Sequence, residues 1–64
     1  MTLSEIKAAT QAGQTVHWKN SVYKVTCDRL GQWFIKCTAN DHLIGLTHRD
    51  GVTMNGKEED FYTA

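Results

Sequence analysis

The side chains able to do chemistry in this 64-residue chain include three histidines and two cysteines. Structural zinc sites usually take their ligands as closely spaced pairs. Cys27 and Cys37 do not form a C-x-x-C pair, and His17, His42 and His48 do not form an H-x-x-x-H pair. We therefore expect no metal site, and no sequence motif indicates any other cofactor.

The sequence gives equally little support for a catalytic site. Both cysteines fall on the apolar side of the strands described below, and apolar surroundings raise the pKa of a thiol and make it inert. The acidic residues of segment 57–60 and Asp50 are typical of solvated surface, and a domain of this size has little room for a pocket that excludes water. Gly45, Gly51 and Gly56 are isolated and do not form a phosphate-binding loop. We expect a protein that is not an enzyme.

Charge and hydropathy exclude several partner classes. Seven Lys and Arg balance seven Asp and Glu, so no overall field directs the chain to nucleic acid or to an anionic membrane. No apolar run approaches the ~20 residues of a membrane span, and the first residues lack the pattern of a signal peptide. We expect a cytoplasmic protein of a bacterial host, with no membrane partner and with reduced cysteines.

The elements that position these residues begin with a helix. Thr2 and Glu5 have the spacing of a capping box, in which each side chain accepts a hydrogen bond from the other's backbone N–H. Leu3, Ile6 and Ala9 then form an apolar stripe, and Gly13 supplies a residue suited to the end of a helix. The pattern predicts a helix over about residues 3–12.

After this helix, short runs of β-branched and aromatic residues alternate with turn residues. The pattern predicts strands over residues 15–18, 22–28, 32–38, 42–47 and 52–54, and a turn or helical turn over residues 57–60. The fold class is therefore α+β: residues 1–64 form a single domain, a short N-terminal helix packed on a four- or five-stranded antiparallel β-meander. A sheet that curls as in SH3 domains is the alternative arrangement.

Turn chemistry predicts the register of the central hairpins. A three-residue loop ending at Gly31 sets Val25 opposite Ile35, and hence Cys27 opposite Trp33. A two-residue turn at residues 40–41 would set Ile35 opposite Leu46. This register places most apolar residues on one face, which the helix covers, and it separates Cys27 from Cys37 by more than a disulfide allows. We expect both cysteines, together with Val52 and Phe61, to belong to the core or its edges.

The opposite face carries the candidate binding residues Lys24, Thr26, Phe34 and Lys36. Lys24 lies opposite Lys36, and like charges directly opposed are unfavourable unless something neutralises them. Lysines beside an aromatic ring are typical of a platform for single-stranded nucleic acid. Exposed apolar residues such as Leu43 are instead typical of a protein-binding or dimer surface. An ordinary solvated face is the third interpretation.

A family resemblance narrows the biological context. The helix ending at Ala12-Gly13, the stretch 16–20 with Tyr23 and Val25, and the turns around Asp50-Gly51 and Asn55-Gly56 resemble small uncharacterised proteins of tailed bacteriophages and prophages. The resemblance covers nearly the whole chain and implies an accessory protein or inhibitor that binds a host protein. We therefore expect a small noncatalytic binding module. The alternative is a small nucleic-acid-binding domain that uses the outer sheet face. In either case the protein could act as a homodimer.

Overall fold

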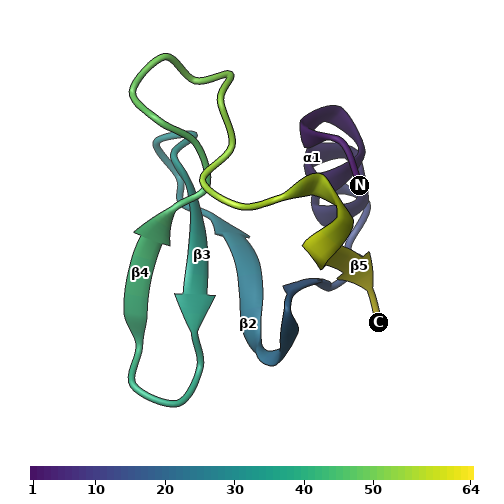
Figure 1. Ribbon diagram of the computed structural model, residues 1–64. Coiled ribbons are helices and arrows are strands. Elements are labelled where there is room, and N and C mark those ends of the chain that lie inside the picture. Colours follow the sequence, from purple (N-terminus) through teal and green to yellow (C-terminus); the bar gives the residue numbers. More distant parts are fainter.

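The computed structural model describes the whole chain, residues 1–64, as a short helix with an antiparallel sheet. In chain order the elements are α1 (Leu3–Gln11), β1 (Val16–Trp18), β2 (Asn20–Cys27), β3 (Trp33–Cys37), β4 (His42–Gly45), the 3-10 helix η1 (Glu58–Asp60) and β5 (Phe61–Thr63). The strand order is β4-β3-β2-β1-β5. Figure 1 labels β4, β3 and β2 beside one another, with α1 and β5 on the far side of β2. The predicted α+β class is confirmed. The SH3-like curl is not confirmed, because the sheet is open and has β4 and β5 as its edges.

The helix begins and ends as its sequence predicts. The Glu5 backbone N–H donates to Thr2 Oγ1 over 3.2 Å, and the Thr2 N–H donates to Glu5 Oε1 over 2.8 Å, which completes the capping box. Helical residues stop at Gln11, and Gly13 follows with a φ of 87°. No helix has the length and apolar character needed to cross a membrane.

The hairpin of β2 and β3 has the predicted register. Val25 pairs with Ile35 and Cys27 with Trp33. Gly31 has a φ of 81°, a left-handed conformation that glycine adopts without steric cost, so the three-residue loop closes as expected.

The hairpin of β3 and β4 differs from the prediction by two residues. Ile35 pairs with Ile44 instead of Leu46, because a four-residue connection, residues 38–41, replaces the two-residue turn. Two features hold this longer loop: the His42 N–H donates to Asn40 Oδ1 over 2.9 Å, and Asp41 adopts a φ of 59°. A shift of two residues keeps every side chain on its predicted face, because side chains alternate with period two.

The prediction of a strand over residues 52–54 is wrong. Only an isolated bridge joins Thr47 to Met54, and Val52 is exposed. The fifth strand is Phe61–Thr63, which pairs with β1 directly after η1, so the expected helical turn near residues 57–60 is confirmed.

The core lies between α1 and the inner face of the sheet. Six buried residues form one cluster: Ile6, Val16, Val25, Ile35, Leu46 and Phe61. Trp18, Tyr23, Trp33 and Ile44 pack against it while half-buried. Only 7 of the 64 residues are buried, so each large core side chain carries a substantial part of the stability.

The loop that replaces the expected strand is held by Asp50. The Thr53 hydroxyl donates to Asp50 Oδ2 over 2.6 Å, and the backbone N–H groups of Thr53 and Val52 donate to Oδ1 over 2.9 Å each. These bonds, the Thr53 hydroxyl first, stabilise the carboxylate and lower the pKa of Asp50 to about 2.

This depressed pKa gives a testable pH dependence. Because the folded pKa lies below the ordinary value of 3.8, the carboxylate stabilises the fold above about pH 4, and this contribution is lost as the pH falls through about 2. In an NMR titration, the Asp50 side-chain carbon should show a midpoint near 2. Thr53→Val removes the hydroxyl donor and should raise that midpoint, whereas Thr38→Val should leave it unchanged. An unchanged midpoint in Thr53→Val would contradict the assigned cause.

Candidate functional site

The outer face of the sheet, turned away from α1, holds all four residues that the sequence singles out. α1 packs on the inner face, where its Ile6 joins the cluster of Val25 and Ile35. Lys24 pairs with Lys36, and Thr26 with Phe34. Directly opposed residues share a face, so the four side chains occupy one surface, as the sequence predicts.

A row of side chains crosses all five strands on this face. Tyr62 pairs with His17, His17 with Lys24, Lys24 with Lys36, and Lys36 with Leu43. Lys24, Leu43 and Tyr62 are exposed, while His17 and Lys36 are half-buried. The row therefore presents two lysines between an aromatic end at β5 and an aliphatic end at β4.

His17 is held in a fixed position within this row. Its Nδ1 lies 2.9 Å from the backbone oxygen of Tyr23, and it must donate to that oxygen because a carbonyl can only accept. The His17 and Tyr62 rings lie side by side, with centroids 5.5 Å apart. The other ring nitrogen, Nε2, makes no hydrogen bond within the protein.

A shallow groove of about 430 Å³ is hollowed into the same face beside the row. Seven residues from β2, β3, β4 and the adjoining loops line it: Thr26, Cys27, Asp28, Phe34, Lys36, Asp41 and Leu43. Of the four predicted site residues, the structure brings three into the groove and leaves Lys24 outside it. Phe34 and Leu43 supply its main apolar surface.

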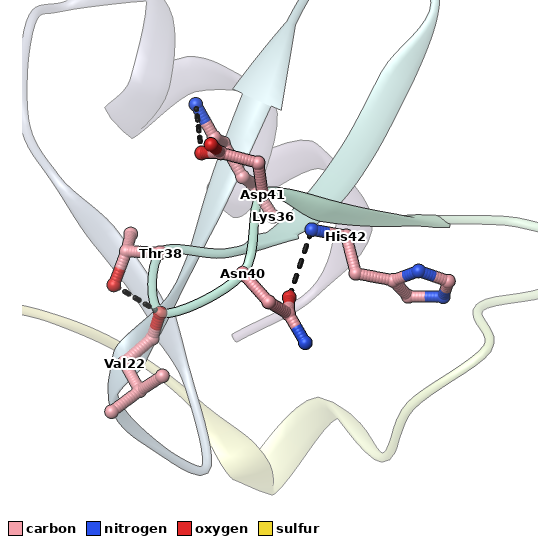
Figure 2. A network of polar contacts seen from close by, with 6 residues as sticks. All are labelled: Val22, Lys36, Thr38, Asn40, Asp41 and His42. Carbon is pink, nitrogen blue, oxygen red and sulfur yellow. Dashed lines mark hydrogen bonds and ion pairs between the residues drawn. The ribbon is translucent and has the colours of Figure 1, made fainter.

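An ion pair occupies one end of the groove. Lys36 Nζ lies 3.4 Å from Asp41 Oδ1, and the two side chains point toward each other in Figure 2. This carboxylate partly neutralises the opposed charges of Lys24 and Lys36. Because the Asp41 side chain is exposed, the pair contributes little to stability and a ligand can displace it.

Asp28 stands at the other end of the groove. Its Oδ1 accepts hydrogen bonds from the backbone N–H groups of Leu30 and Gln32, each over 2.9 Å. Its Oδ2 makes no hydrogen bond or ion pair within the protein. One carboxylate oxygen therefore shapes the loop while the other remains free.

The two cysteines differ from each other. Both are free thiols, but only Cys37 is buried, so the expectation that Cys27 belongs to the core is wrong. Cys27 is the last residue of β2, and its exposed Sγ lies 3.4 Å from the Asp28 backbone oxygen. No group of three His, Cys, Asp or Glu side chains is placed to hold a metal ion.

Sequence reasoning missed four residues of this surface. His17 joins it through the pairing of β1 with β2, and Tyr62 joins it through the pairing of β5, a strand absent from the sequence prediction, with β1. The sequence places Asp28 at the end of the strand 22–28 and Asp41 in a turn, and alternation along the strands indicates that both side chains lie on the outer face.

Comparison with known proteins gives this chain no relative: no protein-family model, no curated protein and no solved structure matches it.

Proposed function

We propose that this protein is a small noncatalytic binding module that binds a protein partner through the outer face of its sheet. The resemblance to small proteins of tailed bacteriophages and prophages makes a bacterial cytoplasmic protein the expected partner. An accessory protein or inhibitor of this kind acts by covering a surface of its target, and it needs no catalytic group.

The groove is the observation that supports this proposal. It brings apolar surface from Phe34 and Leu43 together with charged side chains, and no residue of α1 or of the loop 46–57 lines it. Protein interfaces obtain most of their affinity from a few apolar or aromatic contacts surrounded by polar groups. A side chain of the partner that fills the groove would make such a contact.

Phe34→Ala should abolish capture of the partner without unfolding the protein. Phe34 lies on the outer face and is not part of the core cluster, so its loss removes contact surface and not core packing. Tagged wild-type and variant proteins are incubated with nuclease-treated bacterial lysate, and retained proteins are compared by mass spectrometry. Leu30→Ala is the matched control, because Leu30 is more exposed but lies at a hairpin tip outside the groove.

Two outcomes would overturn the proposal. Equal capture by wild type and Phe34→Ala, with both folded by circular dichroism, would show that the outer face is the wrong surface. Self-association of the isolated protein that depends on Phe34, measured by sedimentation, would assign the face to a homodimer contact.

The cross-strand row supports a second candidate, binding of single-stranded nucleic acid. Tyr62 and His17 offer rings for base stacking, and Lys24 and Lys36 offer contacts to phosphates. Phosphate contacts would make affinity fall steeply with salt, whereas burial of apolar surface is much less sensitive. Retention of nucleic acid that Lys24→Ala and added salt both abolish would move this candidate to first place.

The two carboxylates of the groove favour a protein partner over nucleic acid. Asp28 and Asp41 line the groove together with a single lysine, so its lining carries a net negative charge, which repels phosphate.

A further inference from the structure

Asp28 carries the one charge in the groove that no opposite charge neutralises. Lys36 and Asp41 are paired with each other, whereas Asp28 has no ion-pair partner. Its Oδ2 is free because the loop uses only Oδ1. The groove thus presents a single available anion at the β2 end.

An aromatic ring lies next to this anion. Phe34 pairs with Thr26, and Asp28 follows Thr26 by two residues on the same face, so Phe34 and Asp28 are diagonal neighbours. Diagonal neighbours across antiparallel strands are about 7–8 Å apart, within the reach of one long side chain. A ligand in the groove can therefore contact the ring and the carboxylate together.

We propose that this groove binds an arginine side chain of the protein partner, an inference that rests on the proposed function. The guanidinium stacks on Phe34 and donates a hydrogen bond to Asp28 Oδ2, while its methylene stem lies against Leu43. Arginine fits better than lysine, because its planar group stacks on an aromatic face and donates in fixed directions at the same time. An acidic side chain or a phosphate would meet an unneutralised carboxylate.

Peptide selection followed by a single-atom change tests the proposal. Peptides that bind the wild-type protein are selected from a random dodecapeptide library, and those that fail to bind Phe34→Ala are kept. Each retained peptide is synthesised with arginine, lysine or citrulline at its common basic position. Citrulline keeps the shape of arginine and removes its charge, so it should bind at least about tenfold more weakly.

A matched protein variant completes the test. Asp28→Asn keeps an oxygen to accept from Leu30 and Gln32, so the loop persists, but it removes the charge. This variant should bind the arginine peptide at least about tenfold more weakly and should no longer distinguish arginine from citrulline. Glu59→Gln makes the same charge change on η1, outside the groove, and should bind as the wild type does.

The outcomes distinguish a failure of the arginine assignment from a failure of the proposed function. Retained peptides with no basic residue, or with affinity unchanged by Asp28→Asn, would overturn the arginine assignment and leave the proposed function standing. A library that yields no peptide dependent on Phe34 would overturn both. Displacement of the arginine peptide by a thymidine oligonucleotide would assign the groove to nucleic acid and would also overturn the inference.

Discussion

Ile35→Ala should lower the free energy of unfolding by about 2–5 kcal/mol, the range for removing a large side chain from a packed core. The Ile35 side chain is fully buried at the centre of β3, between Val25 on β2 and Ile44 on β4. Its truncation would leave a cavity within the core cluster. Urea denaturation followed by tryptophan fluorescence measures the change.

Leu43→Ala is the control for this measurement. Leu43 lies on the neighbouring strand but on the outer face, where half of its surface is exposed. Its truncation should cost less than about 1 kcal/mol, as surface substitutions generally do. A loss below ~0.5 kcal/mol for Ile35→Ala would mean that the faces of β3 are inverted relative to this structure.

Turn chemistry made the first half of the fold predictable. The capping box and Gly13 set the limits of the helix, and Gly31 set the register of β2 with β3. Each of these signals is local, so the residues that carry it are close together in the sequence.

The connection from β3 to β4 shows where local signals fail. Asn40 and Asp41 are typical of a two-residue turn, but a longer loop closes here, held by bonds from Thr38 to the backbone oxygen of Val22 on β2. That contact depends on a third strand, so no rule about the turn itself reveals it. The side chains of β4 nevertheless lie on their predicted faces, because the register differs from the prediction by an even number of residues.

The C-terminal region was predicted least well, because its pairing partner lies at the far end of the chain. Residues 61–63 pair with β1, and residues 52–54 lose their expected strand to the loop that Asp50 holds. The candidate site was affected in the same way. The four predicted residues do share one face, but Tyr62 joins it only through the pairing of β5 with β1.

The division between the two faces links the fold to the proposed function. A chain of this length has few residues for a core, and here nearly all of them are on the inner face. The outer-face residues are thus free to change without loss of the core, which is the condition a binding surface needs. The substitutions proposed for Phe34 and Asp28 depend on this separation.

Gly56→Ala should lower the free energy of unfolding by about 1–3 kcal/mol, the usual cost of overpacking. A Cβ at Gly56 would lie 3.2 Å from Cε2 of Phe61, 3.1 Å from Cε2 of Trp18 and still closer to Trp18 Nε1. The φ of Gly56 is not in the left-handed region, so the close approach of the indole is what requires glycine.

The indole cannot easily move away from an added methyl group. Its ring packs edge-on against Tyr23, with centroids 5.1 Å apart, and lies 6.4 Å from the Phe61 ring. Lys19 Nζ lies 4.5 Å from its centroid. Trp18 Nε1 is buried with no hydrogen-bond partner, and a Cβ at Gly56 would lie directly against it.

A double-variant cycle identifies the cause of this cost. Trp18→Phe removes Nε1, the atom that the new methyl group would meet most closely. In that background Gly56→Ala should cost at least about 0.5 kcal/mol less than in the wild type, since contacting residues show interaction energies of this size. Equal costs in both backgrounds, measured by the same urea denaturation, would show that the indole is not the obstacle. The close packing of Gly56 on Trp18 would then not be the reason that glycine is required at position 56.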